Sequence, residues 1–423
     1  MLVAALLIAM YPDWVPARWP SADLKSLELL TKTPINCLWL ERPQWSSEFA
    51  LEAAKHGIAT LGVIRREGDP IEAARALSKT GMTGGVIEGD FDDYSIMIVT
   101  ATLAKAKMTY LEAGPRSHLH FDTAAPILAT TQGLWPGIHV EKGSDASAGP
   151  TANPWIDTNT GFLRHARAST GAAIWIAVQP PPNTVYPVAR YLQAIGDAAM
   201  NGARWVVSLD DDLQRGLLAR EPKALQQWTQ LTAALQHFED HREWRATVPA
   251  GQIGVVQDDA QARLSGGLFD MLAAKHMPVF AVPGSRLEEL NKAGKLIFAA
   301  PPLGLVTQGT WIFDKNDVSV NTAWQKISGE VGRQNKGARL FNVSSMLSHL
   351  VALQGQRQLV LHLVNYSTYP ASGITARVLG NYRRARLFRP GEAPVDLEIE
   401  KVEDGTGFAI DQRINTIATV VLE

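Results

Sequence analysis

A regular alternation of short apolar runs and amphipathic stretches over residues 1–245 constrains this chain more than any other feature. Short apolar runs that end in glycine, proline or an acid are typical of buried strands, and the stretches between them have helical spacing. Eight such units predict a closed parallel (β/α)8 barrel, a fold of about 250 residues. The expected strands are Val3–Met10, Ile35–Leu40, Ala59–Ile64, Gly85–Glu88, Met108–Glu112, Leu134–Val140, Ala172–Val178 and Arg204–Leu209. An open doubly wound sheet is the alternative, but the glycine-rich phosphate loop typical of such sheets is missing after the first strand.

The remaining chain divides into two further predicted domains, because 423 residues exceed what one core of about 250–300 residues can organise. Residues 246–304 restart the strand, helix, strand pattern and predict a small α/β unit of flavodoxin-like type. Residues 305–423 predict an antiparallel β-sandwich, because alternating strands separated by turn residues prevail there. Val343–Leu353 is the one stretch of this part with a helical pattern.

Composition restricts the partners of the protein. The formal net charge of -2 gives no general basic field for nucleic acid or anionic lipid, so we expect neither partner. The single cysteine, Cys37, excludes an internal disulfide, and we expect it to be a buried core residue. The apolar opening Leu2–Met10 is too short to span a bilayer and is interpreted as part of the first strand. We expect residence outside the cytoplasm after removal of a signal peptide, with the cytoplasm as the alternative.

Acids gather at the predicted carboxyl ends of the barrel strands, where barrel enzymes carry their active sites. Two carboxylates at suitable separation are the minimum equipment for glycoside hydrolysis, with one as proton donor and the other as nucleophile or base. The alternative is that single acids cap the next helix or pair with nearby arginines. The candidate catalytic residues are Glu88, Glu112 and Asp210, and the neighbouring acids are Glu41, Asp90 and Asp211.

Tryptophans are predicted near the same rim, where their flat faces can stack on sugar rings. Trp14, Trp39 and Trp135 are the candidates, and Trp155 lies in the long connection 141–171. Ordinary packing is the alternative, because tryptophan is often partly buried in any fold.

His118 and His120 follow the fifth expected strand with the spacing of a two-histidine metal motif. Hydrogen-bonded histidines are the simpler interpretation, and we expect neither a bound metal nor a cofactor. The sequence contains no GxSxG elbow and no Walker motif, which argues against a serine triad or a nucleotide-phosphate enzyme.

The order of parts resembles that of multidomain bacterial glycoside hydrolases of the β-galactosidase type, in which an amidotransferase-like α/β unit and a terminal β domain follow the barrel. The stretches that carry this resemblance are Gln252–Gln257, Gly267–Lys275, Pro278–Val282, Leu359–Tyr366 and Ile417–Leu422.

The resemblance implies an Asn-Glu acid/base after strand four and a glutamate nucleophile after strand seven. Glu88 matches the acid, but Ile87 replaces the asparagine and Gln179 stands at the nucleophile position. A neutral amide cannot form the glycosyl-enzyme ester, so the standard retaining mechanism is in question.

The leading hypothesis is therefore a glycoside hydrolase with Glu88 as acid and Glu112 or Asp210 as its partner. A catalytically silent carbohydrate-binding or scaffold protein is the second hypothesis, and a metal-dependent barrel hydrolase is the third. The 246–304 unit is a candidate surface for a homo-oligomer. The expected carbohydrate contacts are Glu41, Trp14, Trp39, Asp90, Arg116, His118, Trp135, Gln179 and Asp211.

Overall fold

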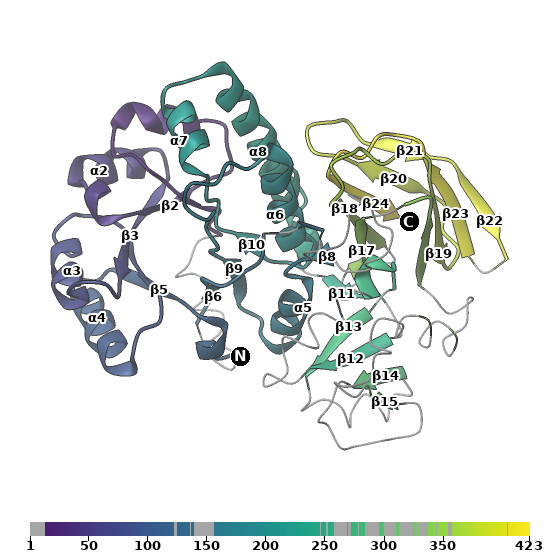
Figure 1. Cartoon of the computed structure of the whole chain (residues 1–423), viewed down its shortest axis with the longest axis horizontal. Helices are drawn as coiled ribbons and strands as arrows, with labels where there is room; N and C mark the ends of the chain where they lie inside the picture. Colours follow the sequence, from purple (N-terminus) through teal and green to yellow (C-terminus); the bar gives the residue numbers. More distant parts are fainter. Residues whose placement is uncertain are drawn as a thin grey trace. The chain divides into compact units, whose positions relative to one another are not determined.

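The computed structural model of the chain contains two compact units (Figure 1). The first comprises residues up to 133 together with 170–186 and 203–236, and the second comprises 134–169, 187–202 and 237–423. The predicted boundaries at 245 and 304, which follow chain order, stay a prediction. The structure describes residues 13–121, 125–135, 137–138, 156–245, 247–250, 253–257, 269, 272–277, 279–283, 296–299, 310–312, 325, 329, 337–343, 345–353, 358–403 and 405–423.

The first unit contains the predicted eight-stranded parallel barrel. Its strands, in spatial order, are β1 (Pro16–Arg18), β2 (Cys37–Leu40), β3 (Ala59–Arg65), β4 (Gly84–Glu88), β5 (Thr109–Gly114), β6 (Ile127–Thr130), β9 (Ala173–Ile176) and β10 (Arg204–Trp205). The last strand returns to the first, because Ala17 pairs in parallel with Val207 just beyond β10. Two backbone hydrogen bonds close this seam, from the amide of Arg18 to the Val207 carbonyl at 2.8 Å and from the amide of Val207 to the Pro16 carbonyl at 3.0 Å.

Two of the expected strands are placed differently from the sequence prediction. The first described strand is Pro16–Arg18, whereas Val3–Met10 lies outside the described residues. The prediction of Leu134–Val140 as the sixth strand is wrong, because Ile127–Thr130 occupies that position between β5 and β9. The later run is broken by Pro136 and Gly137, and its described part forms the short β7 (Gly137–Ile138), antiparallel to β8 (Ile156–Asp157).

Capping side chains start several helices that follow barrel strands. Ser46 accepts from the Phe49 amide, Asp69 caps the next helix, and Asp92 accepts from the Ser95 amide. Such caps satisfy amides that have no partner inside the helix. The helices that carry residues of this unit are η1 (Leu24–Leu30), η2 (Arg42–Gln44), α2 (Ser47–Lys55), α3 (Pro70–Leu77), α4 (Asp93–Lys105), η3 (Arg116–His118), α7 (Asp211–Leu218) and α8 (Pro222–Asp240).

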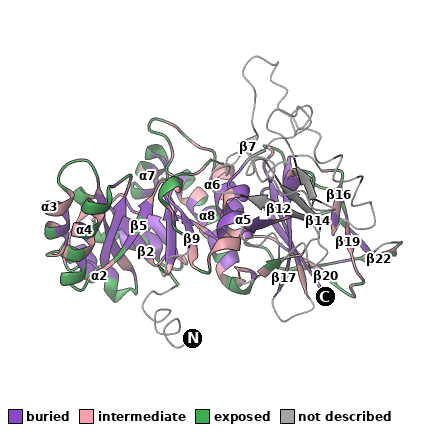
Figure 2. Cartoon of the chain, turned by 90° about the horizontal axis from the view of Figure 1, so that it is seen from below, coloured by how far each residue is buried: buried purple, intermediate pink, exposed green. Residues whose placement is uncertain are grey.

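The inside of the barrel is a packed core. Alternate residues of its strands contribute side chains to one buried cluster that includes Trp14, Trp39, Val86 and Trp175. The period of two along a strand places the next residues on the helix-facing side of the sheet. In Figure 2 the barrel strands are buried and the helices around them carry exposed outer faces. The space available to a ligand is therefore at the ends of the strands.

The second unit contains a four-stranded parallel sheet in the order β13-β12-β14-β15. This order places the first strand between the second and the third, as in flavodoxin-like sheets. It confirms the predicted small α/β element among the described residues. The strands are β12 (Ile253–Gln257), β13 (Val279–Pro283), β14 (Leu296–Ala299) and β15 (Thr310–Ile312).

The C-terminal part of the second unit is the predicted antiparallel β-sandwich. A six-stranded sheet, β11-β17-β18-β24-β20-β21, and a four-stranded sheet, β16-β19-β23-β22, contribute to one apolar core. Val343–Leu353 was predicted as a helix, and this prediction is wrong because β17 (Met346–Leu353) is a buried central strand. The other strands are β11 (Thr247–Pro249), β16 (Ala338–Phe341), β18 (Leu359–Asn365), β19 (Ile374–Leu379), β20 (Ala385–Phe388), β21 (Val395–Leu397), β22 (Ile399–Val402), β23 (Gly405–Ile410) and β24 (Ile417–Leu422).

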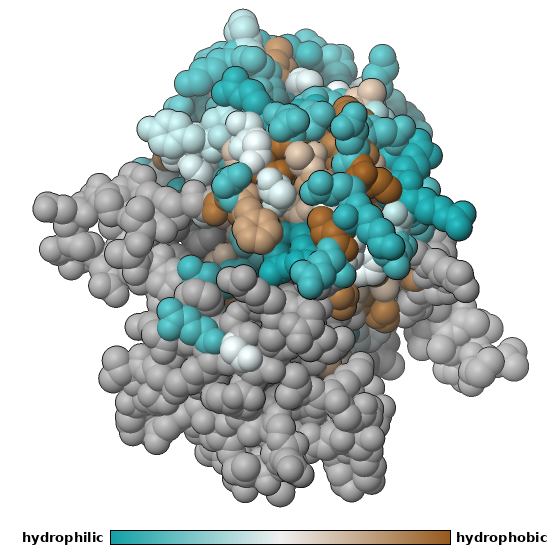
Figure 3. All heavy atoms as spheres, turned by 90° about the vertical axis from the view of Figure 1, so that its right-hand side faces the viewer, coloured by the Kyte–Doolittle hydropathy of each residue, from teal (hydrophilic) through white to brown (hydrophobic). Residues whose placement is uncertain are grey.

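Helices α5 (Thr160–Ser169) and α6 (Val188–Met200) also belong to the second unit, with the short η4 (Arg242–Arg245). Gly196 allows close packing of α6 on the six-stranded sheet, because a Cβ at this position would lie only 3.0 Å from Ile417 and 3.1 Å from Val364. On the described surface in Figure 3, hydrophilic and apolar residues are interspersed. Among the described residues, none of the helices combines the length and apolar character needed to cross a bilayer.

Candidate functional site

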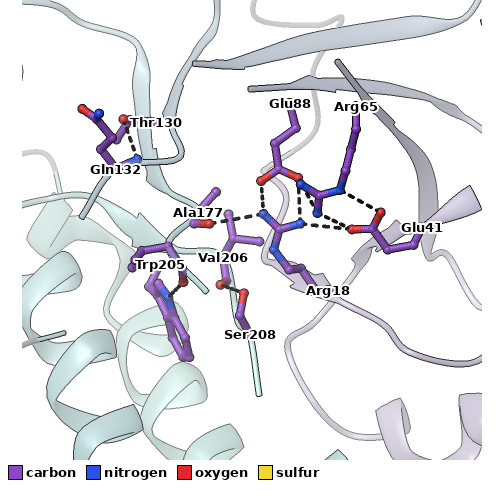
Figure 4. A network of polar contacts seen from close by, with 11 residues as sticks. Arg18, Glu41, Arg65, Glu88, Thr130, Gln132, Ala177, Trp205, Val206 and Ser208 are labelled. Carbon is purple, nitrogen blue, oxygen red and sulfur yellow. Dashed lines mark hydrogen bonds and ion pairs between the residues drawn. The ribbon is translucent and has the colours of Figure 1, made fainter. Parts of the chain in front are cut away.

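Four charged side chains gather at the mouth of the barrel, one from the end of each of the first four strands (Figure 4). Arg18 and Arg65 are the last residues of β1 and β3, Glu88 is the last residue of β4, and Glu41 directly follows β2. The carboxyl ends of parallel barrel strands meet at one rim, which brings these residues together although 70 positions separate Arg18 from Glu88. The result is an alternating network of two guanidiniums and two carboxylates.

Glu88 and Arg18 form the buried half of this network. Nη1 of Arg18 donates to Oε2 of Glu88 at 2.9 Å, and Nη2 donates to Oε1. Nη2 also donates to the carbonyl of Ala177 at 3.2 Å, and the guanidinium lies over the ring of Trp39 at 5.0 Å. The side chains are 3% exposed for Glu88 and 11% for Arg18. Such a bidentate contact fixes the orientation of the carboxylate and supplies hydrogen-bond donors to both of its oxygens.

Glu41 and Arg65 form the exposed half of the network. Their side chains are 42% and 37% exposed, respectively. Nε and Nη2 of Arg65 donate to the two oxygens of Glu41 at 3.1 and 2.6 Å. Although burial lowers the pKa of Arg65, the hydrogen bonds to Glu41 and the charges of Glu88 and Glu41 raise it above its usual value. Nη2 also lies 3.3 Å from Oε2 of Glu88, so the two carboxylates share one nitrogen.

Gln179 lies beside the same two guanidiniums. With its amide oxygen turned toward them, it accepts from Nη2 of Arg65 and from Nη2 of Arg18, each at 3.3 Å. It follows β9 and has an exposed side chain. The resemblance predicted a nucleophile at this position, and the structure places a neutral amide there in contact with the network.

Glu112, a predicted partner of Glu88, faces the other side of the sheet. In the register of β4 with β5, Glu88 is level with Ala113, and Ile87 is level with Glu112. Leu111 and Ala113 belong to the interior cluster, so the intervening Glu112 lies on the outer face, where it is exposed. The structure does not bring Glu112 to Glu88.

Asp210, the other predicted partner, is a helix cap. One carboxylate oxygen accepts from the amides of Asp212 and Leu213 at 3.0 and 2.9 Å, and the other accepts from the Tyr186 amide at 3.1 Å. Its side chain is buried, whereas Asp211 is exposed in the first turn of α7. The capping alternative therefore describes Asp210.

Two of the tryptophans predicted at the rim, Trp14 and Trp39, lie inside the barrel. Trp14 and Trp39 are buried in the interior cluster, as the packing alternative proposed. Trp135 belongs to the second unit, where its ring meets that of Tyr191 edge to face at 5.8 Å. Trp155 lies outside the described residues.

A second polar pair lies in the loops that follow β4 and β5. Nδ1 of His118 is 3.2 Å from Oδ1 of Asp90, and both side chains are more than half exposed. The backbone brings the two loops together, because a Cβ on Gly114 would lie 3.9 Å from the Gly89 carbonyl and 4.0 Å from Cβ of His118. Arg116 is the first residue of η3, the short helix that ends at His118. Its backbone amide donates to Oε1 of Gln132 at 2.9 Å.

The part of the chain that the structure describes contains no cluster of metal-ligating side chains. There, no three side chains of His, Cys, Asp or Glu converge in a way that could hold an ion. His118 instead pairs with Asp90, in agreement with the hydrogen-bonded alternative for this histidine.

Arg18 and Arg65 were not identified by sequence reasoning. Arg65 directly follows a predicted strand, Ala59–Ile64, and Arg18 follows Pro16 and Ala17 of a strand that was expected earlier in the chain. The candidates predicted at the rim were mainly acids and aromatic residues, with Arg116 as the one arginine among them. A count of all charged residues one position beyond each apolar run would have found Arg65.

No protein-family model and no curated protein sequence matches this chain. Solved structures do: an α-L-fucosidase isoenzyme 2 from Paenibacillus thiaminolyticus is similar over 97% of this chain and 99% of its own, with a TM-score of 0.63 and 10% identity. A GH42 β-galactosidase is similar over 84% of this chain and 68% of its own, with a TM-score of 0.46 and 9% identity. An exo-carrageenase GH42 from Bacteroides ovatus is similar over 78% of this chain and 55% of its own, with a TM-score of 0.44 and 8% identity. The first of these likenesses confirms the expected architecture, a parallel (β/α)8 barrel with additional β domains.

Proposed function

We propose that the barrel mouth binds a carbohydrate and that the protein hydrolyses a glycosidic bond there, with Glu88 as the reacting carboxylate. The observation that carries this proposal is the position of Glu88, which is buried at the carboxyl end of β4 between two guanidiniums and shares Arg65 with a second carboxylate. Barrel enzymes place their reacting groups at this end of the strands.

The contacts of Glu88 favour a role different from the predicted proton donor. A carboxylate that accepts hydrogen bonds from a guanidinium through both oxygens is satisfied as the anion. An anion serves as the nucleophile or as the group that stabilises the positive charge of an oxocarbenium-like transition state. Glu88 therefore takes the role that the family resemblance implied for position 179.

We expect a sugar to approach Glu88 past Glu41 and Arg65, the exposed members of the network. Glu41 and Arg65 are both more than a third exposed, and exposed ion pairs contribute only about 0–1 kcal/mol. Opening this pair is thus inexpensive. Glu41, Arg65 and Gln179 are then the first groups that hydroxyl groups of the ligand meet.

Carbohydrate binding without turnover is the second candidate function. Gln179 favours it, because a neutral amide occupies the strand-seven position at which the resemblance implies a nucleophile. Under this candidate the network recognises sugar hydroxyls and no bond is cleaved.

A panel of 4-nitrophenyl glycosides that includes the α-L-fucoside and the β-galactoside separates the two candidates. The proposal predicts release of nitrophenol by the wild type and a loss of more than about 1000-fold in Glu88→Gln, with near-normal turnover in the exposed control Glu221→Gln. Saturable sugar binding in calorimetry without any product supports the binding candidate. Equal turnover by wild type and Glu88→Gln overturns the assignment of Glu88.

A further inference from the structure

Hydrolysis at this mouth requires a group that protonates the departing sugar oxygen, and the carboxylates of the network are engaged elsewhere. Glu88 and Glu41 each accept two hydrogen bonds from a guanidinium, and Asp210 accepts three from backbone amides. Gln179 has no proton to release at working pH. Glu112 lies on the other face of the sheet.

His118 has the properties that these groups lack. Its Nδ1 lies 3.2 Å from Oδ1 of Asp90, so this contact engages one ring nitrogen and does not engage the other, Nε2. A carboxylate that holds one ring nitrogen also fixes the orientation of the ring. The imidazole is 52% exposed, so a ligand can approach it.

The position of the pair relates it to Glu88. Asp90 follows Glu88 by two residues, and the intervening Gly89 has a positive φ of 127°, which allows the chain to turn at the end of β4. His118 lies over Gly114, whose backbone is next to the Gly89 carbonyl. The loops after β4 and β5 thus carry the imidazole beside the end of the strand that bears Glu88.

We propose that His118, oriented by Asp90, is the general acid and base of the reaction at the barrel mouth. This inference rests on the proposed function. In the first step an oxygen of Glu88 bonds to the anomeric carbon, the glycosidic C–O bond breaks, and Nε2 of His118 gives its proton to the departing oxygen. In the second step Nε2 takes a proton from water, the water oxygen bonds to the anomeric carbon, and the bond to Glu88 breaks.

The charged groups near His118 are consistent with this role. Asp90 is the only described residue that pairs with its ring, and Arg116 and His120 are its nearest titratable neighbours in the chain. Asp90 is a positioning residue, because it acts on the substrate only through the imidazole.

The test compares leaving groups. With a substrate from the active panel, His118→Gln should lose about 10²–10⁴-fold in turnover when the leaving group is a sugar or an alkyl alcohol. It should lose far less with a 2,4-dinitrophenyl leaving group, which departs without a proton. The alkaline limb of the pH profile should disappear in His118→Gln and move to lower pH in Asp90→Asn.

The control is His56→Gln, an exposed histidine at the end of α2, which leads back to the start of β3 at the opposite end of the barrel. Equal urea midpoints of all variants exclude a folding defect. If His118→Gln turns over every substrate as fast as the wild type, the role of His118 is overturned and the proposed function still stands. Absence of any turnover by the wild type overturns both.

Discussion

Glu41 and Glu88 bind the same nitrogen of Arg65, at 2.6 and 3.3 Å. The two contacts differ in environment, because Glu41 is 42% exposed and Glu88 is 3% exposed. The network therefore has a stable inner pair, Arg18 with Glu88, and an outer pair that can open toward a ligand.

The inner pair should be important for the stability of the barrel. Arg18→Ala leaves the buried Glu88 with only its 3.3 Å contact to Arg65, and removal of one partner of a buried ion pair costs about 3–5 kcal/mol. Urea unfolding measures this loss. The control Arg42→Ala removes an exposed pair with Glu72 and should change the free energy of unfolding by no more than about 1 kcal/mol. Equal effects of the two substitutions would show that Glu88 is not held as described.

Gln179→Glu should be tolerated and should test the lack of an acid at this position. The amide already lies 3.3 Å from each of two guanidiniums, so a carboxylate in its place gains charge-assisted hydrogen bonds. We expect an unchanged or higher melting temperature, whereas Gln179→Lys should lower it by adding a third cation. A marked loss of stability in Gln179→Glu would contradict the described contacts.

The second unit should lose stability as the pH falls below about 6.5. His349 and His362 lie directly opposite each other on β17 and β18, and His237 packs edge to face against Trp244. Burial lowers the pKa of His237 to about 4 and that of His362 to about 3, and that of His349 is also lowered.

The sign follows from these directions. Between pH 6.5 and about 4 the unfolded chain binds protons that the folded unit does not, so acid favours unfolding by about 1.4 kcal/mol per pH unit for each histidine. Urea midpoints recorded from pH 7.5 to 4.5 measure this slope. His237→Phe should reduce the slope, while the exposed His56→Gln should leave it unchanged. A flat profile would contradict the burial of these rings.

Asn159 should contribute to the stability of the second unit, to which its partners Leu134 and Asp197 also belong. Its side chain accepts from the Leu134 amide at 2.8 Å and donates to the Leu134 carbonyl at 2.9 Å and to Asp197 at 2.9 Å. Asn159→Ala removes these three hydrogen bonds, each of which contributes about 0.5–1.5 kcal/mol. Thermal unfolding should show the loss, and the exposed control Gln226→Ala on α8 should not.

The barrel could be predicted because its signal repeats. Glu88 was located correctly at the rim because Gly84–Glu88 is a continuous buried strand with clear turn signals on both sides. Ile127–Thr130 escaped notice because four residues are too few to stand out, and the apolar run from Leu134 competed with it. Met346–Leu353 is buried almost throughout, so its residues give no alternation to distinguish a central strand from a helix.

The candidate site could be predicted only in part. Acids at strand ends were found, but strand ends also supply helix caps, and the sequence does not distinguish Asp210, which caps α7, from Glu88, which pairs with Arg18. Glu112 was counted with the rim although the alternation of β5 turns it outward. The partners of Glu88 come from strands far apart in the sequence, and only the closed barrel brings them together.

Covalent trapping tests the central claim most directly. A 2-deoxy-2-fluoro glycosyl fluoride of a sugar that the protein hydrolyses slows release of the covalent intermediate, and mass spectrometry of the digested protein then locates the attached sugar. We expect the added mass on the peptide that contains Glu88 and no added mass in Glu88→Gln. A sugar attached to Glu41, or to any residue outside the barrel mouth, would contradict it.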